Sequence, residues 1–503
     1  MKKLLISFLV CFVVAAFIFS CHNFAFAQGN EKLSAVGVFD ELNRQAGNPT
    51  AHVRLITDNN EAWYARWYVL SRAKKSIDVT YFIVEKDVFG MSMLGILLKK
   101  AREGVKVRLM MDARGTKELT RTMLGQDYLQ ELIAVPNVEI HVYNPASANI
   151  ISAVGNIRNL TGSNHDKIII VDGEWFICGG RNVSMNYFVD PSDEPTVYRD
   201  TDVILRGKKA VGGIQLAFDE EFKSHMVFNV TRDFFGNWVS RAHELDIARM
   251  AMESYISGMG TPAVAANYKY ADVLARYTTE LSKYKKMQSY SGYDPMNGVH
   301  EYPIVVLDKH SYKGKRNDIT PAISAFMKTA EKEVMIQNPY VVLTPEAMNA
   351  LKAANSNGVS INIHTNSPVS SDSLLTQAFF LEDWPGILKN LTNCKLFAFN
   401  TVRKLHSKTF VFDREITVVG TYNMDYVSEQ INSEVVVAIK SKDFAQRTAL
   451  RILNDEKESV EYKVKLNSDG TPQPLFGPES HSDPKKIDLL NNLRKLGFLR
   501  PLI

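Results

Sequence analysis

The stretch from Asn164 to Asn182 reads NHDKIIIVDGEWFICGGRN and decides how the rest of the chain is interpreted. Its first half contains His165, Lys167 and Asp172 with the spacing H-x-K-x4-D. A β-branched apolar run follows the lysine, which is typical of a strand that is buried on both faces. The aspartate and the next glycine form a turn signal, and a second apolar run then returns. The stretch therefore predicts a hairpin that presents an imidazole and an ammonium on one side.

The same pattern recurs late in the chain, where residues 405–423 read LHSKTFVFDREITVVGTYN. This second copy contains His406, Lys408 and Asp413 at the same spacing. Behind the hairpin, each copy continues with small residues and an asparagine: Gly179, Gly180 and Asn182 in the first copy, and Gly420, Thr421 and Asn423 in the second. One such match is weak evidence, whereas two copies with matching tails argue against coincidence.

Two facing copies would place two histidines, two lysines and two asparagines around one pocket, and this set suits phosphoryl transfer. Lysine and asparagine donors can hold the non-bridging oxygens of a phosphodiester and stabilise the charge that develops. One histidine can attack phosphorus and form a covalent intermediate. The other can protonate the leaving oxygen and then activate an incoming alcohol or water. Because the ammonium groups supply positive charge, we expect neither a metal ion nor another cofactor.

The candidate site residues fall into two groups by their chemistry. The motif residues are assigned as catalytic: His165, Lys167, Asp172, His406, Lys408 and Asp413. The two aspartates lie at turns, so we expect them to act as supporting hydrogen-bond partners rather than as reacting groups. Polar residues that follow the two hairpins are assigned to phosphate binding: Asn182, Asn423 and Thr421.

These paired motifs resemble the phospholipase D superfamily, in which two HKD motifs build one active site. Within it, the chain most resembles the bacterial cardiolipin synthase branch, and the resemblance covers most of residues 50–455. The resemblance implies an α/β fold with two similar phospholipase D-type α/β/α domains, related by a pseudo-two-fold axis, that share one active site. It also implies a covalent phosphohistidine intermediate and metal-free chemistry.

Segments that follow each motif in the sequence extend the resemblance. YRDTDVILRG and INSEVVVAI are similar to segments of this branch, which makes Asp200 and Glu434 the implied acidic partners of the catalytic histidines. Family practice favours the histidine of the first motif as nucleophile, so we assign attack to His165 and acid–base catalysis to His406. The chain departs from the family pattern at Thr421, where serine or glycine is more usual. It also lacks a tryptophan that is often found near Phe222.

The N-terminus reads as a secretory signal peptide over residues 1–27. Two lysines precede an almost wholly apolar run, and the sequence Ala-Phe-Ala before Gln28 is typical of a cleavage site. Two alternatives remain: a lipoprotein attached at Cys21 behind a poor cleavage box, and an uncleaved anchor, since the apolar run approaches membrane-spanning length. All three place the catalytic part beyond the cytoplasm, as a periplasmic, secreted or envelope-associated protein. No other stretch is long and apolar enough to cross a membrane.

Composition bounds the class of protein and its partners. With 45% hydrophobic and 23% charged residues, the 503-residue chain is typical of a globular protein with more than one domain. The formal net charge is +4, or +2 after loss of Lys2 and Lys3 (57 basic against 55 acidic residues), which is low for a general nucleic-acid binder. Cleavage would leave Cys178 and Cys394, which we expect to be buried thiols rather than a disulfide.

Strands alternate with helices along the chain, which predicts α/β domains with a mixed, largely parallel sheet. The segment EVMIQNPYVV at 333–342 parallels SIDVTYFIV at 76–84, so the second half repeats the first. We divide the chain into a signal peptide, a first phospholipase D-like domain, a helical linker, a second such domain and a tail: 1–27, 28–234, 235–300, 301–463 and 464–503.

Two further segments could contact a membrane. The insert 146–163 is expected to form a loop beside the site, which either touches lipid or packs on the surface. Residues 464–484 are rich in Asn, Ser, Gly and Pro and are predicted to be coil. A final helix should begin at Pro484, with apolar residues on one side and lysine and arginine on the other. Such a helix can lie on an anionic membrane or pack back onto the protein.

The leading hypothesis is an enzyme that cleaves or exchanges a phospholipid phosphodiester at a membrane surface, like a cardiolipin synthase. Transfer of the phosphatidyl group to an alcohol, such as the glycerol of phosphatidylglycerol, would give cardiolipin, and transfer to water would be hydrolysis. The alternative is a secreted nuclease of the same superfamily, although the near-neutral charge makes nucleic acid the less favoured substrate. A third hypothesis is a non-enzymatic interaction protein. The oligomeric state does not follow from the sequence.

Overall fold

The structure is a computed structural model that describes most of the chain behind the N-terminal segment: residues 33–116, 119, 128–144, 162–224, 227–232, 241–290, 292–311, 314 and 316–502. The expected signal peptide and nearly all of the insert 146–163 lie outside these residues, so both remain predictions. Among the described residues, no helix combines the length and the hydropathy that a membrane crossing needs.

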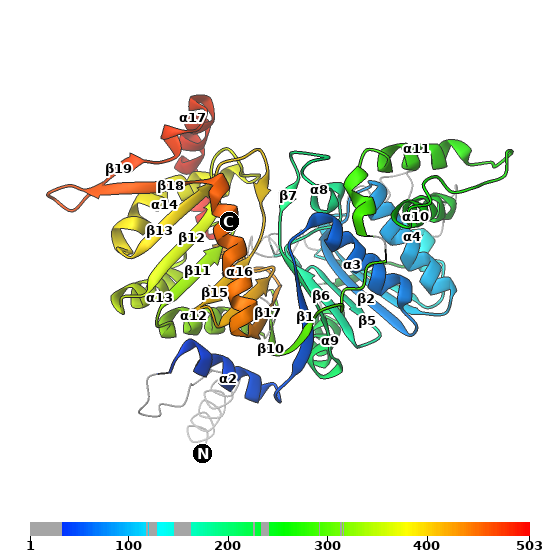
Figure 1. Ribbon diagram of the computed structural model, residues 1–503, viewed down its shortest axis with the longest axis horizontal. Coiled ribbons are helices and arrows are strands. Elements are labelled where there is room, and N and C mark those ends of the chain that lie inside the picture. Colours follow the sequence, from blue (N-terminus) through cyan, green and yellow to red (C-terminus); the bar gives the residue numbers. More distant parts are fainter. Residues whose placement is uncertain are drawn as a thin grey trace, which may run out of the picture. The chain divides into compact units, whose positions relative to one another are not determined.

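All but one of the described strands of the first half form one sheet (Figure 1). From its edge to the junction with the second half, the hydrogen-bonded order is β9 (Val227–Asn229), β4 (Val138–Tyr143), β3 (Lys106–Gly115), β2 (Ser76–Ile83), β5 (Ile168–Val171), β6 (Trp175–Gly179), β8 (Asp202–Arg206) and β1 (Thr50–Ile56). The described helices of this half are α3 (Asn59–Arg72), α4 (Val88–Arg102), α5 (Tyr128–Ile133), α8 (Met185–Phe188), α9 (Lys208–Phe222), α10 (Ala242–Ile256) and α11 (Ala271–Leu281), whereas α2 (Ala35–Gln45) precedes them in sequence and packs on the second half.

The second half repeats this arrangement. Its order from the junction outward is β10 (His300–Lys309), β17 (Glu434–Lys440), β16 (Ile416–Gly420), β15 (Thr409–Phe412), β11 (Glu333–Gln337), β12 (Ser360–Asn366), β13 (Cys394–Phe399), β18 (Ser459–Leu466) and β19 (Pro472–Phe476). Its main helices are α12 (Ile319–Thr329), α13 (Pro345–Ser356), α14 (Leu374–Asn390), α15 (Tyr426–Gln430), α16 (Lys442–Asp455) and α17 (Pro484–Leu493). Strands β1 and β10 pair antiparallel, so the sheet continues from one half into the other. The predicted internal repeat is confirmed.

The expectation of a largely parallel sheet is wrong. In this sheet, the parallel pairs of the described strands are confined to β2–β3–β4 and β11–β12–β13. The reason lies in the motifs themselves, because each folds as a tight hairpin and a hairpin pairs its own strands antiparallel. Hairpins β5–β6 and β15–β16 therefore bring antiparallel pairing into the centre of each half.

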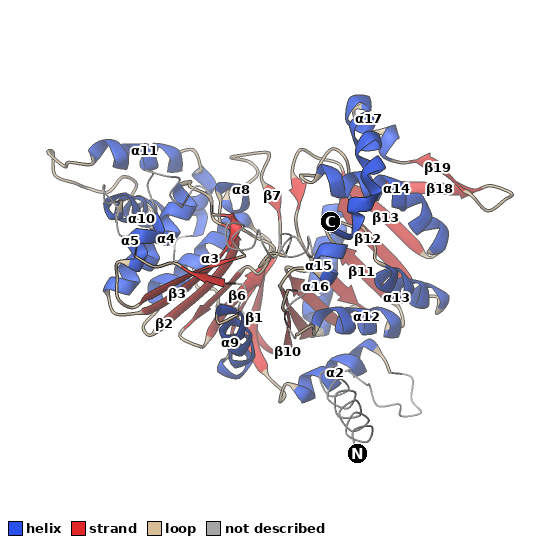
Figure 2. Ribbon diagram, turned by 180° about the vertical axis from the view of Figure 1, so that it is seen from behind, coloured by secondary structure: helices blue, strands red, loops and turns tan. Residues whose placement is uncertain are grey.

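Side chains of β5 alternate between two hydrophobic cores. Ile169 faces a core that it shares with α3, α4 and α10, whereas Ile168 and Ile170 face a second core. The second core contains residues of α9 and of strand β17 from the other half. Layers of other elements therefore cover both faces of this strand, as its continuous apolar sequence predicts, and helices flank the strands in Figure 2.

Helix α10, in the segment that we expected to be a linker, belongs to the core of the first half. It packs along α4 and contributes Leu245, Ala248 and Met252 to that core. At Gly95 of α4, a Cβ atom would lie 2.2 Å from the carbonyl oxygen of Leu245. Any side chain there would push the helices apart, so this glycine permits their close packing.

The two halves also pack face to face beside the junction. Cys178 and Leu205 of the first half share a hydrophobic core with Val435 and Val437 of the second. Strands β6 and β8 thereby contact β16 and β17, so the two motif hairpins pack directly against each other. Both remaining cysteines are free thiols as expected, although Cys394 is only half-buried.

The C-terminal tail differs from the expected coil. Strands β18 and β19 form a hairpin that extends the sheet from β13. Asn467, Ser468 and Gly470 lie in its turn, and the prolines of β19 are tolerated because β19 is an edge strand. Helix α17 packs back onto α14 through Ile487 and Leu490, so docking onto the protein is the alternative that the structure shows for this helix.

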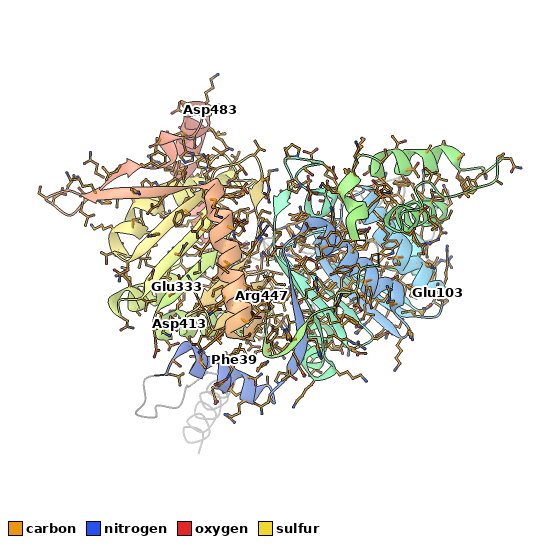
Figure 3. All side chains as sticks on the ribbon, viewed as in Figure 1. Phe39, Glu103, Glu333, Asp413, Arg447 and Asp483 are labelled. Atoms are coloured by element: carbon orange, nitrogen blue, oxygen red, sulfur yellow. The ribbon has the colours of Figure 1, made fainter. Side chains whose placement is uncertain are left out.

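Asp172 and Asp413 stabilise the motif hairpins at the strand ends opposite the histidines. Both adopt positive φ angles, of 55° and 54°, at the turns. The Asp413 carboxylate accepts hydrogen bonds of 2.7 to 3.1 Å from the backbone N–H groups of Glu331, Lys332 and Glu333, directly before β11 (Figure 3). Asp172 makes the corresponding contacts directly before β2. Each aspartate therefore ties its hairpin to the neighbouring strand, in keeping with a supporting role.

Replacing Asp413 with alanine should destabilise the fold without removing a group from the active site. Three backbone donors would lose their acceptor, so we expect the free energy of unfolding to fall by about 2 kcal/mol. Denaturant titration followed by circular dichroism measures this change. Glu415→Ala is the matched control in the same turn, because a surface ion pair such as Glu415–Lys442 contributes less than about 1 kcal/mol. An Asp413→Ala protein as stable as the wild type would contradict the supporting role.

Candidate active site

The structure brings the two motifs together at one site. His165 lies three residues before the start of β5 and His406 three residues before that of β15, and the two residues are only 8% and 5% exposed. Lys167 and Lys408 follow in the same segments and are fully buried. A β-bridge between Asn164 and Ser433 and the contact of His406 with Asp200 join the two motif segments across the halves.

Each histidine takes its carboxylate partner from the opposite half of the chain. His165 Nδ1 lies 3.0 Å from both carboxylate oxygens of Glu434. His406 Nδ1 lies 2.8 Å from Asp200 Oδ2. The resemblance implied that both residues would be acidic partners but not which histidine each would serve. Because the pairs are crossed, neither half contains a complete histidine–carboxylate pair.

The backbone crosses in the same way as the side chains. The N–H group of His165 donates to the carbonyl oxygen of Ser433, and that of His406 donates to the carbonyl oxygen of Arg199, at 3.1 and 2.8 Å. The second contact extends a short parallel pair between β7 (Tyr198–Arg199) and β14 (Lys404–Leu405). Residues directly before each carboxylate therefore hold the histidine that this carboxylate contacts.

These contacts determine how the imidazole rings can react. A carboxylate is an acceptor, so the ring nitrogen that faces it carries the proton, which assigns the proton to Nδ1 of His165 and of His406. Nε2 of each neutral ring then has a free lone pair. Burial, followed by the charges of Lys167 and Lys408, lowers the pKa of His165 well below its usual value. Burial and Lys408 also lower the pKa of His406, so both rings favour the neutral form.

The two lysines are held mainly by backbone. Lys167 Nζ donates to the carbonyl oxygen of His165 at 2.8 Å, and Lys408 Nζ donates to the carbonyl oxygen of His406 and lies 2.9 Å from its Nδ1. Burial lowers the pKa of Lys167 to about 7 and that of Lys408 to about 8. An ammonium has three donors, so both groups can donate to an anion that enters the site.

The two carboxylates differ in their surroundings. Burial raises the pKa of Glu434 above its usual value, although the charge of Lys167 and the hydroxyls of Ser428 and Thr421 oppose this rise. Burial would also raise the pKa of Asp200, but the hydrogen bond with His406 and nearby positive charge outweigh it and lower the pKa. Asp200 is therefore the more firmly ionised partner.

Thr421, which we assigned to phosphate binding, is engaged with Glu434 in this structure. Its hydroxyl donates to the Glu434 carboxylate and accepts from the N–H group of Val435 at 3.0 Å. The corresponding residue of the first motif, Gly180, has no room for a side chain, since a Cβ atom would lie 2.3 Å from Asp200 Oδ1. The departure from the family pattern at Thr421 thus gives Glu434 a hydroxyl donor that Asp200 lacks.

The two asparagines that follow the motif hairpins, Asn182 and Asn423, have different hydrogen-bond partners. Asn182 Oδ1 accepts from the N–H group of Ile83, and its Nδ2 donates to the hydroxyl of Tyr187, both at 3.2 Å. Asn423 is 5% exposed, and its Oδ1 has no hydrogen-bond partner among the described residues. Asn423 therefore retains hydrogen-bonding capacity at a buried position, whereas Asn182 is fixed by the protein itself.

An aromatic wall beside His406 was not predicted from the sequence. Tyr187 and Tyr198 stack on each other at 4.4 Å between ring centroids, and each meets the His406 ring edge-on at about 5.5 Å. The hydroxyls of Tyr198 and Tyr340 both donate to the carboxylate of Asp372, at 3.1 and 2.8 Å. Tyrosines at these positions have no motif spacing, and only the proximity of Tyr198 to Asp200 could have drawn attention to it.

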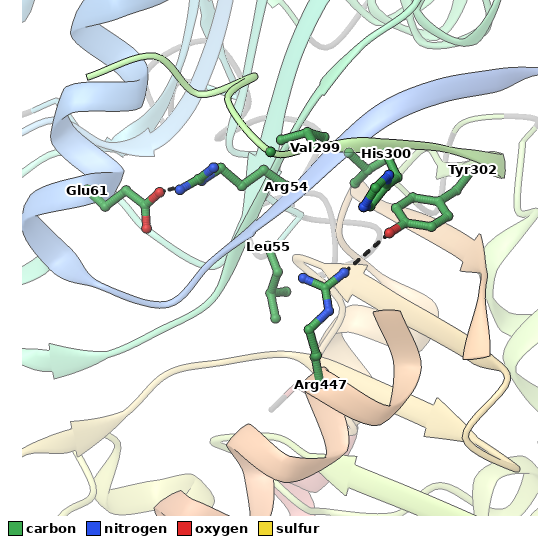
Figure 4. A pocket seen from close by; sticks show the side chains of 9 residues that line it. Arg54, Leu55, Glu61, Val299, His300, Tyr302 and Arg447 are labelled. Atoms are coloured by element: carbon green, nitrogen blue, oxygen red, sulfur yellow. Dashed lines mark hydrogen bonds and ion pairs between the residues drawn. The ribbon is translucent and has the colours of Figure 1, made fainter. Parts of the chain in front are cut away.

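A pocket at the junction of β1 and β10 contains none of the motif residues (Figure 4). Arg54, Glu61, His300, Tyr302 and Arg447 are among its lining residues. Arg54 pairs with Glu61 at 2.6 Å, and Arg447 donates to the Tyr302 hydroxyl at 3.2 Å. We assign this pocket no part in the reaction.

Comparison with known proteins finds the same design in a known family. The family model described as cardiolipin synthase, PLD-like domain, matches residues 67–225 and 323–454, which together make up more than half of the chain. Probable cardiolipin synthase YwiE of Bacillus subtilis is 24% identical over 414 residues, which cover 82% of this chain and 67% of that protein. Cardiolipin synthase C of Escherichia coli K12 is 24% identical over 428 residues, which cover 80% of this chain and 84% of that protein.

A solved structure supports the fold. Phosphatidylserine synthase of Haemophilus influenzae Rd KW20 matches with a TM-score of 0.59 at 12% identity, and the match covers 92% of this chain and all of that one. At such low identity, the likeness concerns the fold alone. Each range of the family match contains one motif hairpin, and the paired hairpins meet at one site. The chain therefore belongs to the phospholipase D superfamily, in its cardiolipin synthase-like branch.

Proposed function

We propose that the chain is a phosphatidyltransferase that acts on phospholipids through a covalent phosphohistidine, as a cardiolipin synthase does. The crossed arrangement of two histidines, each bound to a carboxylate from the other half, is the observation that carries this proposal. Such an arrangement supplies a nucleophile and an acid–base group on one phosphodiester. Curated relatives described as cardiolipin synthases support phospholipids as the substrate class.

The first step would transfer the phosphatidyl group to the enzyme. Nε2 of His165 attacks phosphorus and forms a P–N bond, while the P–O bond to the leaving alcohol breaks. His406, as an imidazolium, gives its Nε2 proton to the leaving oxygen. Lys167 and Lys408 stabilise the negative charge on the non-bridging oxygens as the transition state forms.

The second step would release the group to an acceptor. Neutral His406 takes a proton from an alcohol or water, whose oxygen forms a new P–O bond to phosphorus. The P–N bond to His165 breaks, which restores both rings. Transfer to an alcohol such as the glycerol of phosphatidylglycerol gives cardiolipin, and transfer to water gives phosphatidic acid.

The unequal carboxylates support this division of roles. The pKa of His165 is lowered farther than that of His406, so His165 remains an unprotonated nucleophile. The more firmly ionised Asp200 stabilises the imidazolium form of His406, which an acid needs. Environments that separate the pKa values of two like groups commonly assign one as acid and the other as base or nucleophile.

Replacing either histidine with alanine should abolish phosphatidyl transfer. We expect His165→Ala and His406→Ala to lower kcat by more than about 1,000-fold, because each removes a reacting group. The assay incubates the protein with phosphatidylglycerol, with and without added alcohols, and resolves the lipid products by mass spectrometry. His300→Ala, in the separate junction pocket, is the matched control and should retain activity. Full activity of both motif variants would contradict the mechanism, and turnover of DNA but not lipid would favour a nuclease.

An activated leaving group should distinguish the roles of the histidines. The nitrophenolate group of a nitrophenyl phosphodiester leaves without protonation. His406→Ala should therefore release nitrophenolate in a single burst at a rate close to that of the wild type. His165→Ala should give no burst, because it lacks the nucleophile. Stopped-flow absorbance measures the burst, and digestion of quenched protein locates the phosphate on a peptide. A phosphorylated peptide that contains His406 instead of His165 would reverse the assignment.

The parameter kcat/KM should fall as the pH rises above neutrality. The free enzyme loses the ammonium charges of Lys167 and Lys408 near their pKa values of about 7 and about 8. A bound phosphodiester anion favours the charged lysines, so kcat should fall only at higher pH. Steady-state profiles across this range measure both parameters. Lys167→Arg, which keeps its charge, should flatten the fall in kcat/KM, and an unchanged profile would contradict the assignment.

A further inference from the structure

A second pair of acidic side chains lies directly behind the first motif. Asp166, between His165 and Lys167 in sequence, is 2% exposed, and Glu221 near the end of α9 is 4% exposed. Both residues hydrogen-bond to Asn164, and each carboxyl group acts on the pKa of the other. Among the described residues, neither Asp166 Oδ1 nor Glu221 Oε1 receives a hydrogen bond from an ordinary donor. Two buried carboxylate oxygens would repel each other unless a proton lay between them.

We propose that Asp166 and Glu221 share one proton, as a carboxylic acid and a carboxylate, and that this pair positions the catalytic residues His165 and Glu434. Asp166 is the donor and Glu221 the acceptor. Both are positioning residues, because they touch the backbone and side chains that hold the histidine rather than the reacting atoms. The role in turnover rests on the proposed function, whereas the shared proton does not.

Glu221 fixes the backbone on both sides of His165. Its Oε2 accepts a hydrogen bond from Asn164 Nδ2 at 2.8 Å. Asn164 Oδ1 in turn accepts from the N–H group of Asp166 at 3.1 Å. Together with the Asp166–Glu221 contact, these bonds close a ring around the residue between Asn164 and Asp166, which is His165. The conformation of this segment therefore depends on the link between the two carboxyl groups.

The same glutamate also contacts the strand segment that carries the partner of His165. The hydroxyl of Ser433 lies close enough to Glu221 to lower the pKa of that carboxyl. The carbonyl oxygen of Ser433 accepts from the N–H group of His165 at 3.1 Å, and the next residue is Glu434. Glu221 thus faces the segments of both partners in the first histidine–carboxylate pair.

Charges around the pair do not neutralise it. Burial raises the pKa of Asp166 well above its usual value, and the negative charges of Glu221 and Asp308 raise it further. Lys309 lies nearby, but its Nζ donates to the carbonyl oxygen of Asn432, and burial lowers its pKa to about 8. The titratable groups that face the pair from neighbouring elements are Asp112, Tyr143, Lys167, Cys178, Asp308, Lys309, His310 and Glu434.

At the corresponding positions around the second motif, an ion pair takes the place of the shared proton. Ser407 occupies the position of Asp166, and its hydroxyl lies 3.0 Å from that of Thr201. Near the end of α16, Asp455 takes the place of Glu221 and forms a buried ion pair with Arg199 at 2.7 Å. An arginine stays charged at every pH that the protein survives. Only the support of His165 therefore depends on a proton that can be removed.

The test counts the protons that the chain releases when it unfolds. Above about pH 5, an unfolded aspartate is ionised, whereas folded Asp166 keeps its proton, so unfolding of the wild type releases it. Asp166→Asn donates the same hydrogen bond to Glu221 without a titratable proton. We expect its unfolding near neutral pH to release about one proton fewer than that of the wild type. The sign is fixed, because a raised pKa stabilises the fold at low pH and this stabilisation is lost as the pH rises.

Infrared spectra of the folded protein provide a second measurement that needs no activity. The wild type should show the carbonyl stretch of a protonated carboxyl group that Asp166→Asn loses. Asp455→Asn is the matched control, because it breaks the corresponding link behind His406 without removing a shared proton. If Asp166→Asn fails to fold, Glu221→Gln replaces it, since its amide donates to Asp166 and lets that carboxyl ionise. An unchanged proton count and an unchanged band would overturn the shared proton.

Turnover then tests the positioning role. We expect kcat of the wild type to fall at alkaline pH as the pair loses its proton, and Asp166→Asn to move this fall upward by at least about one pH unit. Asp166→Ala should lower kcat about tenfold with KM nearly unchanged, because the substrate contacts remain while the histidine loses its support. If the proton count changes but kcat keeps its wild-type pH profile, the positioning role is wrong. If the wild type turns over no phospholipid, the proposed function fails, whereas the proton count still decides the pair.

Discussion

The hydrogen bond between each motif histidine and a carboxylate of the opposite half is the constraint on which the rest of the structure depends. Bonds of 2.8 to 3.0 Å tolerate little displacement, so the two hairpins must keep one relative position. The β1–β10 pair, the core shared by β6, β8, β16 and β17, and the backbone contacts at Ser433 and Arg199 all hold that position. Each of these is a contact between halves, so the fold is organised around its internal interface.

Duplication supplied two equal hairpins, and small differences at matching positions made the histidines unequal. Where the first copy has Gly180 beside Asp200, the second has Thr421, whose hydroxyl donates to Glu434. Tyrosines surround His406, whereas Phe82 meets the ring of His165 edge-on at 5.1 Å. None of these changes touches a reacting atom. They alter the electrostatic environment of each imidazole and therefore its pKa. In this way two copies of one motif can take different steps of one reaction.

The parts that the sequence predicts are those with local signals. Residue spacing, turn residues and apolar runs specify the hairpins and the lysine beside each histidine. The crossing of the partners has no such signal, because Glu434 lies 269 residues from His165 along the chain and only the packed halves decide which carboxylate faces which ring. The coil was misjudged, and the packing of α10 into the core was not foreseen, for a related reason. Composition averages over a segment, whereas the close packing of α10 at Gly95 and the turn of the β18–β19 hairpin depend on single positions.

The crossed pairs also have a consequence for the nascent chain. His165 emerges from the ribosome long before Glu434, and strand β1 must wait for β10 before its second edge is paired. Closing loops of this length is slow compared with forming the local hairpins. The first half can collapse early, yet His165 lacks its carboxylate partner until almost the whole chain has been made. Any activity that needs both histidine–carboxylate pairs would thus arise only when synthesis is nearly complete.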